Sequence, residues 1–589
     1  MKLEVVGKGG GRTLASYGVV FSLYVFATWF TTPHTIGDTM VYVDAILRVI
    51  NGGSTTFRDQ GGFLSFWEFG HLLWRPLGWL FFRLADPLIR FTFGTDVRAS
   101  VTLALIGLNW LFGVLAVFSL HALLSHLCRR ERIILVATSG FIFSNAFLNF
   151  FQSGCSYVPG LALLLLGMYL IVKAGSEQSQ SNWGWLLAGI SLATSIGMWL
   201  PYVFAIPAAL SSPVLLFGFT RHRLRIVLLT ALSCGLTILL TYAIAIFALQ
   251  LDGPSEIKSW IASSSHHVTE NWGISRVLFG VPRSLIDMGS DSVFFKRFLT
   301  RDNYNPVTLL DLVRRSLWKL AFAYVFLISL SFVLLRSTHG RRVLALLLVN
   351  AVPVAGFALA FAGGVLERYL PLFPSIFIAL GYSLSTNQPR PSVRYIALAF
   401  VLLATIVNVS ATYNPVVGRK KEATTARLHD LQPFLNEGSR VFVAPQDQLW
   451  GHFGRLQLEQ DISLQTVRID PVAVLGTAQV PWWREEFAKE TLAVWESKSN
   501  IWISKRLISR SPRSEWNWTE GEDMRIAWED LYEFFSGLEV STSVGGDDGF
   551  VLVTPSPKNI SILFNVLHGT QPTNSMDFNI NSQRFVRLA

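Results

Sequence analysis

Two neighbouring segments decide how this chain folds: residues 17–31, YGVVFSLYVFATWFT, and residues 37–45, GDTMVYVDA. The first is an uninterrupted apolar run, which predicts a helix that enters a membrane. The second contains Asp38, seven residues after Thr31, so this acid should lie just beyond the membrane boundary. A carboxylate in that position is a candidate catalytic base.

The whole composition supports a membrane protein. Of the 589 residues, 51% are hydrophobic and only 15% are charged, which excludes an ordinary water-soluble protein of this length. Eleven apolar stretches predict transmembrane helices, at Tyr17–Thr31, Val101–Leu124, Ile133–Phe151, Val158–Val172, Trp183–Trp199, Pro201–Phe219, Ile226–Leu249, Leu317–Leu335, Val343–Ala362, Tyr369–Leu384 and Tyr395–Ala411.

Basic residues predict the orientation, because Lys and Arg beside a span stay on the cytoplasmic side. Five clusters fall on one side of the eleven spans: around Lys8, Arg130, Arg223, Arg341 and Arg394. The N-terminus is therefore expected in the cytoplasm, and everything after the last span outside it. We expect a bacterial inner membrane. The same topology accounts for many of the basic residues behind the net charge of +10, and no nucleic-acid-binding motif is visible.

Two outer loops are long, residues 32–100 and residues 250–316. Within the first, residues 63–93 are very apolar but carry several charges, including Glu68, Arg75 and Arg83. Burying these charges in hydrocarbon is costly. We therefore interpret this segment as helices that lie in the membrane interface. If it spanned instead, four of the five basic clusters would face outward.

A soluble domain is predicted at residues 412–589, after a membrane domain at residues 1–411. Charge rises there and apolar runs shorten to strand length. The sequence indicates an alternating α/β pattern, with a hairpin turn at residues 545–549 (GGDDG). The expected strands are Arg440–Ala444, Asn500–Ser504 and Phe550–Thr554, and the expected helices are Thr425–Asn436, Glu485–Ser497 and Ala527–Leu538.

Short motifs carry a family resemblance. Gly37-Asp38, Tyr42, Ala45, Gly52-Gly53 and residues 74–77 (WRPL) resemble the first outer loop of GT-C-type glycosyltransferases, in particular the protein mannosyltransferase and aminoarabinose transferase branches. Residues 364–371, GVLERYLP, are similar to a late element of such enzymes. Thr39 differs from the mannosyltransferase pattern, which has a second acid there, and Arg75-Pro76 supplies one proline in place of two.

The resemblance implies an α-helical membrane enzyme with an outer C-terminal domain. It would move a sugar from a polyprenyl-phosphate carrier to an extracytoplasmic glycan, lipid or protein acceptor. In those branches the catalytic acid follows the first span, which matches Asp38. A divalent ion such as Mg²⁺, Mn²⁺ or Ca²⁺ is also compatible with this family resemblance, with Asp38 as a ligand.

The chemistry also follows from the residues. Sugar transfer to a hydroxyl needs a base, and we assign Asp38 to that role. The structural alternative is that Asp38 only caps the helix that begins at Thr39. One direct displacement inverts the anomeric carbon, whereas retention would need a second carboxylate. Asp44 is the nearest carboxylate, but it lies six residues farther along a helix, and this spacing turns its side chain away from Asp38.

The departing phosphate needs cations, and arginine can bind two of its oxygens. Arg75, Arg283 and Arg368 are the candidates, with Arg301, Arg314 and Arg315 in reserve. Arg75 could instead snorkel toward water or lipid headgroups. An ion pair between Glu367 and Arg368 would be an alternative to substrate contact.

The remaining candidates for substrate binding are polar and aromatic. The second loop contains Ser263–Gly273, where His266, His267 and Glu270 can hydrogen-bond a sugar, although a polar surface role is the simpler interpretation for the two histidines. Tyr42, His71, Glu367 and Tyr369 belong to the matched motifs or lie beside them, and packing or capping is the simpler role for His71.

Two other functions fit a membrane protein of this kind. A transporter or flippase of lipid-linked glycans would place polar, broken helices near the membrane midplane, often in repeated halves. Here the polar groups gather in outer loops and no repeat is visible. A non-catalytic scaffold that binds a glycan through the soluble domain is the third possibility.

Overall fold

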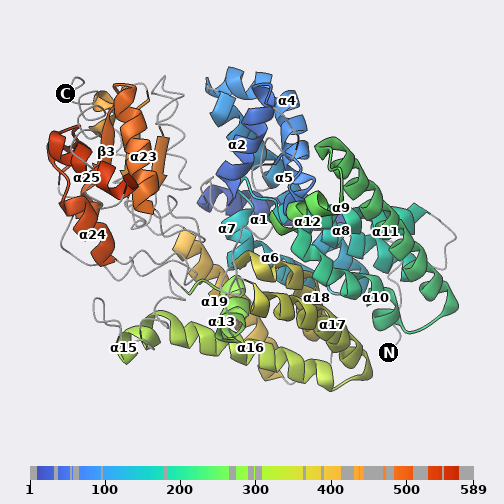
Figure 1. Cartoon of the computed structure of the whole chain (residues 1–589). Coiled ribbons are helices and arrows are strands. Elements are labelled where there is room, and N and C mark those ends of the chain that lie inside the picture. Colours follow the sequence, from blue (N-terminus) through green and yellow to red (C-terminus); the bar gives the residue numbers. More distant parts are fainter. Residues whose placement is uncertain are drawn as a thin grey trace. The chain divides into compact units, whose positions relative to one another are not determined.

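The protein is described from a computed structural model, drawn in Figure 1. The structure describes residues 10–31, 38–53, 56, 65–94, 97–176, 183–263, 274–288, 298, 308–361, 366–385, 391–412, 430–436, 438–443, 468–471, 483–508, 528–546 and 549–568. The chain divides into two compact units. One comprises residues 1–299 and 307–414, and the other comprises residues 300–306 and 415–589.

The first unit is helical. Its elements are α1 (Gly10–Phe30), α2 (Thr39–Ile50), η1 (Phe69–His71), α4 (Trp74–Phe93), α5 (Val97–Leu127), α6 (Glu131–Ile142), α7 (Asn145–Phe150), α8 (Tyr157–Ser176), α9 (Trp183–Met198), η2 (Leu200–Ala205), α10 (Ile206–Phe217), α11 (Arg221–Leu249), α12 (Pro254–Ser263), α13 (Ile274–Leu285), α15 (Leu309–Leu312), η3 (Val313–Leu317), α16 (Trp318–Leu335), α17 (Thr338–Ala360), η4 (Leu366–Leu372), α18 (Phe373–Ser385) and α19 (Pro391–Thr412).

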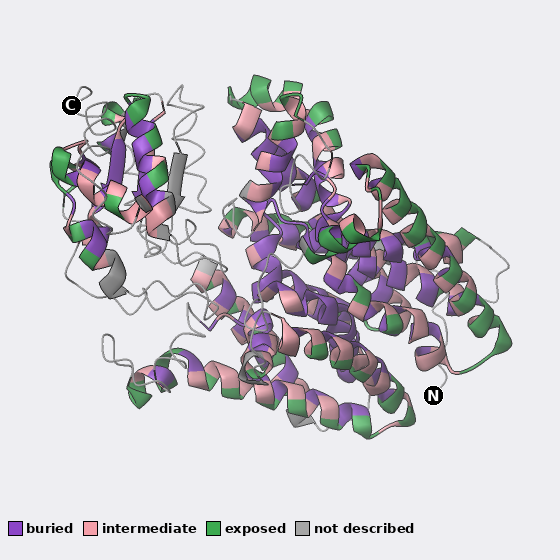
Figure 2. Cartoon of the chain, in the orientation of Figure 1, coloured by how far each residue is buried: buried purple, intermediate pink, exposed green. Residues whose placement is uncertain are grey.

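Seven helical segments in the described part of the chain are long and apolar enough to cross a membrane: Val97–Leu127, Tyr157–Ser176, Leu200–Phe217, Arg221–Leu249, Leu309–Leu335, Thr338–Ala360 and Arg394–Ala411. Two shorter apolar helices, Leu14–Phe30 and Trp183–Met198, accompany them. These nine segments coincide with nine of the eleven predicted spans. The α8 span is 67% buried inside the protein and the α11 span 22%, so α8 is central, and Figure 2 shows α11 mainly in the colours of exposed and intermediate residues. The exposed residues of α11 include Leu228, Leu236 and Leu239.

The other two predicted spans are not among these nine segments. The stretch Ile133–Phe151 is divided into α6 and α7 by an extended residue at Ser144. The break frees the carbonyl of Phe143, which accepts a hydrogen bond of 2.7 Å from Nδ2 of Asn408 in α19. A helix can break inside a membrane protein when a neighbour satisfies the freed backbone group in this way.

The second interrupted span is Tyr369–Leu384. It begins as the 3-10 helix η4 and continues as α18, because Pro371 and Pro374 supply no N–H for a regular helix. Nδ2 of Asn350 in α17 donates to the Pro371 carbonyl at 2.9 Å. Each interruption therefore has an asparagine from a neighbouring helix as its partner.

The first outer loop folds onto the helical unit. Helices α2, α4 and α5 share a core that includes Tyr42, Ile46, Trp74, Phe82 and Leu105. Helix α4 has 20 residues but is not among the seven candidate spans. Its exposed face mixes apolar with basic side chains: Leu80, Arg83, Leu84, Leu88, Arg90 and Phe91. The helix predicted within residues 63–93 is thus present, and its position in the membrane interface stays a prediction.

The second unit contains a five-stranded sheet of order β2-β1-β3-β5-β4. Strand β1 is parallel to β2 and β3, whereas β5 is antiparallel to β3 and β4. The three predicted strands correspond to β1, β3 and β5. The elements are η5 (Gln432–Phe434), β1 (Arg440–Val443), β2 (Arg468–Pro471), α23 (Trp483–Glu496), β3 (Ile501–Ser504), η7 (Lys505–Ile508), α24 (Trp528–Ser536), β4 (Val540–Val544), β5 (Phe550–Val553) and α25 (Pro557–His568).

This second unit has its own core, in which Phe442 of β1 packs with Phe487 of α23 and Phe535 of α24. Gly545 and Gly546 follow β4 with φ angles of 80° and 66°, which favour glycine. They lie between two paired antiparallel strands, as the predicted hairpin requires. The unit is a small α/β domain.

Candidate active site

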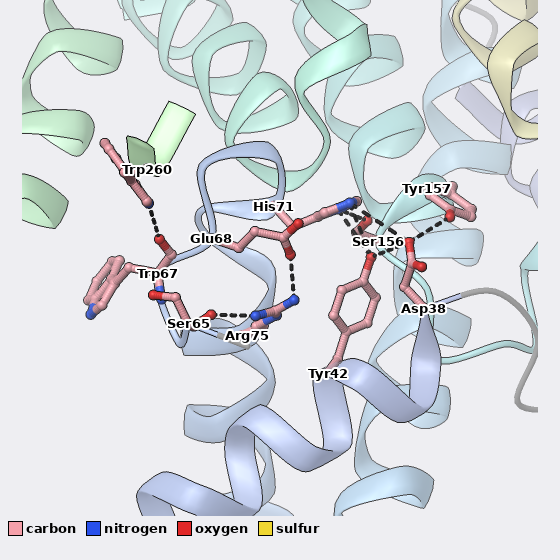
Figure 3. Close-up of polar contacts among 10 residues, drawn as sticks. All are labelled: Asp38, Tyr42, Ser65, Trp67, Glu68, His71, Arg75, Ser156, Tyr157 and Trp260. Carbon is pink, nitrogen blue, oxygen red and sulfur yellow. Dashed lines mark hydrogen bonds and ion pairs between the residues drawn. The ribbon is translucent and has the colours of Figure 1, made fainter. Parts of the chain in front are cut away.

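Asp38 immediately precedes α2 and has two tyrosine partners. Its Oδ2 accepts hydrogen bonds from the hydroxyls of Tyr42, at 3.3 Å, and Tyr157, at 3.1 Å (Figure 3). Asp38 occupies the N-cap position, but its side chain makes no capping hydrogen bond to the helix. Capping alone therefore does not explain this carboxylate. Its side chain is 26% exposed, so another molecule can reach it.

His71 completes the cluster around Asp38. Its Nε2 lies 3.9 Å from Oδ2 of Asp38, and its Nδ1 is 2.8 Å from Oγ of Ser156. The Tyr42 hydroxyl is within 3.2 Å of the same ring. His71 is nearly buried in η1, so the structure brings this predicted residue to the candidate base.

The surroundings of Asp38 are largely dry. Burial raises the pKa of the Tyr42 phenol well above its ordinary value, and the Asp38 carboxylate adds to that rise. Burial also raises the pKa of the neighbouring Cys155 thiol to about 12, with the Asp38 charge as a second cause. Both groups keep their protons at physiological pH. Tyr42 therefore approaches the carboxylate as a hydrogen-bond donor.

The surroundings of Arg75 differ from those expected from the sequence. Its guanidinium is fully buried, forms an ion pair with the equally buried Glu68 and donates to the Ser65 carbonyl. Its Cζ also lies 5.2 Å from the centre of the Tyr42 ring. The snorkelling alternative was wrong, because the charged group does not reach water. The geometry instead makes Arg75 a support behind Tyr42.

Asp44 lies apart from Asp38. Its Oδ1 forms an ion pair of 2.7 Å with Nη2 of Arg98, the second residue of α5. The sequence spacing already predicted that these two acids point in different directions, and α2 is helical through Asp44. This ion pair gives Asp44 a structural partner. Substrate contact is therefore not needed to explain it.

The predicted residues Glu367, Arg368 and Tyr369 lie in η4, which packs against α7, α8 and η2. Glu367 is buried, and its charge contributes to the raised pKa of the Cys155 thiol, as the charge of Asp38 does. The charges of Asp38 and Glu367 therefore act on the same buried thiol.

Arg368 and Tyr369 have aromatic and helical neighbours. The guanidinium of Arg368 is half-buried and lies 5.0 to 5.5 Å from the ring centres of Trp199, Phe357 and Phe361. Tyr369 is buried against α13 at Gly280, where a Cβ atom would be 2.4 Å from the tyrosine hydroxyl. Glycine at position 280 is what lets the two elements approach.

The second long loop contributes less to the described site. Arg283, near the end of α13, is half-buried, and its carbonyl accepts a hydrogen bond from Asn145. His266, His267 and Glu270 lie outside the described residues, as does the reserve candidate Arg301. The other two reserves, Arg314 and Arg315, are exposed in η3.

Sequence reasoning missed Tyr157, Ser156 and the role of Glu68. A usable signal was present for the first two. With the predicted topology, the third span ends on the same side as the first, so the segment after it falls on the side of Asp38. Residues 153–157, SGCSY, are polar for a membrane boundary. Glu68 offered no comparable signal, because its burial depends on Arg75.

No step of the chemistry is assigned to a metal ion. Within the described ranges, no group of three or more His, Cys, Asp or Glu side chains could hold one. The groups around Oδ2 of Asp38 are two phenols that donate hydrogen bonds and an imidazole, which is a poor cation-binding set for that oxygen. Any part for Mg²⁺, Mn²⁺ or Ca²⁺ stays a prediction.

Comparison with known proteins finds similar structures but no similar sequences. No protein-family model matches the sequence, and no curated protein matches it. Among solved structures, ArnT from Cupriavidus metallidurans bound to undecaprenyl phosphate matches with a TM-score of 0.53 and 10% identity, over 93% of this chain and 98% of that one. Its apo structure matches with a TM-score of 0.52 and 10% identity, over 94% and 98%.

The Archaeoglobus fulgidus oligosaccharyltransferase, in complex with Zn and sulfate, gives a TM-score of 0.48 at 14% identity, over 94% of this chain and 76% of that one. The match to ArnT extends over nearly the whole of both chains, although hardly any residues are identical. Such a likeness shows the fold. The protein has the GT-C fold that the motifs of its first outer loop predicted.

Proposed function

We propose that the protein is a membrane glycosyltransferase that moves a sugar from a polyprenyl-phosphate carrier to a hydroxyl of an extracytoplasmic glycan, lipid or protein acceptor. The observation that carries the proposal is the Asp38 carboxylate, partly exposed yet held by two buried phenols beside an imidazole. The fold supports it, because ArnT with that fold was crystallised with undecaprenyl phosphate.

The reaction assigns one task to Asp38. Its carboxylate takes the proton of the acceptor hydroxyl while the acceptor oxygen attacks the anomeric carbon. The bond from that carbon to the phosphate oxygen breaks, and polyprenyl phosphate leaves with its electron pair. A single displacement of this kind inverts the anomeric configuration. A retaining route would need a second carboxylate as the nucleophile.

The leaving phosphate needs positive charge at a partly dehydrated boundary. Arg368 and Arg283 are the proposed groups, since both are half-buried and neither is fully enclosed. Tyr369, and outside the described residues His266, His267 and Glu270, are proposed to contact the sugar or the acceptor. The active site would face away from the cytoplasm, in a bacterial inner membrane, with the second unit on the same side.

The test compares two acids that lie six residues apart, Asp38 and Asp44. Purified protein in nanodiscs is incubated with a panel of polyprenyl-phosphate sugars and candidate acceptors, and free polyprenyl phosphate is measured. We expect Asp38→Asn to lower release by about 10² to 10⁴-fold, the usual contribution of a general base. Asp44→Asn, the matched control, should leave release close to that of the wild-type protein.

Two outcomes would count against the proposal. Full activity of Asp38→Asn would reject this residue as the base. Movement of intact lipid-linked sugar across proteoliposomes, without any release of polyprenyl phosphate, would favour the transporter alternative. NMR of the product made by the wild-type protein would show inversion or retention at the anomeric carbon directly.

A further inference from the structure

The two oxygens of Asp38 have different surroundings. Both tyrosine hydroxyls and the His71 ring approach Oδ2, at 3.1, 3.3 and 3.9 Å. Within the ranges that the structure describes, no hydrogen bond or ion pair reaches Oδ1. In Figure 3 the dashed lines converge on one carboxylate oxygen and leave the other one clear. One oxygen is thus anchored, while the other makes no hydrogen bond or ion pair within the described residues, on a side chain that is 26% exposed.

Each phenol is itself held in place. Tyr42 is completely buried, with the guanidinium of Arg75 beside its ring, and Arg75 is fixed in turn by Glu68. Tyr157 packs against Trp199 and Phe150, with ring centres 4.8 and 5.0 Å away. Two separate sets of packed side chains therefore end at one oxygen atom.

The position of Tyr157 is also fixed through its backbone. The Tyr202 hydroxyl donates to the Tyr157 carbonyl at 2.6 Å, at the start of α8. In the described chain the Tyr157 hydroxyl makes a single hydrogen bond, and its acceptor is Asp38. Because a phenylalanine would fill nearly the same space, the role of the Tyr157 hydroxyl is its hydrogen bond to the Asp38 carboxylate.

We propose that Tyr157 and Tyr42 are positioning residues that anchor Oδ2 of Asp38, so that Oδ1 is the atom that receives the proton of the acceptor. This inference rests on the proposed function and specifies how its base works. A carboxylate without anchors rotates about its Cβ–Cγ bond and presents either oxygen. Anchoring one oxygen keeps the other in a reactive orientation, and such preorganisation of a catalytic group accelerates a reaction.

The anchoring predicts a particular kinetic effect. Hydrogen bonds to an ionised oxygen are strong, so the two phenols hold Oδ2 of Asp38 in one orientation. Removing either phenol hydroxyl should lower kcat while KM changes little, because the anchoring role places neither hydroxyl against the substrates and replaces the substrate contact expected for Tyr42 from its motif.

The experiment is a double-mutant cycle on released polyprenyl phosphate. Tyr157→Phe and Tyr42→Phe should each lower kcat by about tenfold, with KM for donor and acceptor within about twofold of wild type. In an Asp38→Asn background the same substitutions should change the remaining rate by less than about twofold, because they act only through Asp38. Additive losses in that background would overturn the proposal, since they would mean a general structural effect.

Tyr24→Phe is the matched control. Tyr24 is also a buried tyrosine, but its hydroxyl donates to the Trp110 carbonyl at 2.7 Å, so this variant should keep the wild-type kcat. Where Asp38→Asn has no measurable rate, Asp38→Glu provides the second background, because a longer side chain moves the carboxylate away from both phenols. A full tenfold loss from Tyr157→Phe on top of Asp38→Glu would also overturn the anchoring.

The outcome separates the two proposals. If the wild-type protein releases no polyprenyl phosphate from any donor, the proposed function fails. If the wild-type protein is active and Asp38→Asn is impaired, but Tyr157→Phe keeps the wild-type kcat, the function stands and the anchoring of Oδ2 is rejected.

Discussion

At the scale of single residues, the Glu68–Arg75 pair decides whether the site keeps its shape. Both side chains are fully buried, and removing one partner leaves an unpaired charge inside the protein. We expect Arg75→Met to destabilise the protein by about 3 to 5 kcal/mol. The apparent melting temperature, followed by intrinsic tryptophan fluorescence, should fall clearly.

The double variant Glu68→Leu with Arg75→Met is the control for this prediction. Replacing a whole buried ion pair by apolar residues is often neutral, so most of the lost stability should return. A phosphate-binding Arg75 would behave differently: Arg75→Met would weaken donor binding and leave the melting temperature unchanged. That result would contradict the structural role assigned here.

These residues also show where sequence reasoning succeeds. Asp38 could be singled out because its position depends on the end of one apolar run and the start of the next helix. The divergence of Asp44 followed from helical spacing alone. Tyr157 lies 119 residues away from Asp38 along the chain, and only tertiary packing joins them. The polar residues 153–157 place Tyr157 on the same side of the membrane as Asp38, but the contact between the two side chains cannot be predicted from a local pattern.

At the scale of elements, the turn that precedes α4 is held by three different neighbours. Arg75 of α4 donates a hydrogen bond to the Ser65 carbonyl. Nε1 of Trp260 in α12 donates to the Trp67 carbonyl at 2.8 Å. The hydroxyl of Tyr242 in α11 donates to the Phe69 carbonyl at 3.2 Å. This turn carries Glu68 and His71. Helix α12, from the second outer loop, therefore helps to fix residues of the first.

Trp260→Phe tests that link. The substitution keeps an aromatic ring but leaves the Trp67 carbonyl without its donor, which costs about 1 to 3 kcal/mol for a buried group. We expect faster hydrogen exchange, by about tenfold or more, in the peptide that covers residues 65–73. Mass spectrometry of exchanged peptides provides the measurement.

Trp110→Phe is the comparison, because its Nε1 donates at 3.0 Å to Thr28, away from the turn. It should leave the exchange of residues 65–73 unchanged. Equal exchange in the wild-type protein and Trp260→Phe would show that α12 does not hold the turn.

Elements were predictable where apolar length alone defines them. The nine apolar segments follow from that length, including Leu200–Phe217 and Leu309–Leu335, which contain a 3-10 or π-helical turn. The break after α6 and the 3-10 turn before α18 did not, because apolar composition is continuous across them. What permits each break is an asparagine on a distant helix, Asn408 or Asn350, and its partner cannot be identified from a hydropathy pattern.

At the scale of the whole molecule, two units with separate cores are joined in one chain. The change in composition near residue 412 predicts a domain boundary there, because short amphipathic strands cannot cross a membrane unless they close into a barrel. The order of the strands in the sheet could not be predicted from the sequence. Strand β2 pairs with β1 at one edge, and the last two strands form a hairpin beside β3. Pairing between distant strands is set by packing of the helices against them.

The orientation of the molecule in the membrane decides whether the proposed chemistry can occur, since that chemistry requires Asp38 to face away from the cytoplasm. All three native cysteines are buried, and burial raises the pKa of the Cys155 thiol to about 12, so none should react with a maleimide near neutral pH. Single exposed cysteines can therefore report the side. Asn51, at the end of α2, and Arg221, at the start of α11, are both exposed.

In intact cells, a membrane-impermeant maleimide should label Asn51→Cys, whereas Arg221→Cys should react only after the membrane is permeabilised. The physical reason is the cluster of Arg221, Arg223 and Arg225, whose charges resist translocation. Labelling without either substitution measures the background from the native thiols. The reverse pattern would place Asp38 in the cytoplasm, where the proposed outer acceptors are absent, and would exclude the reaction even if the geometry around Oδ2 were correct.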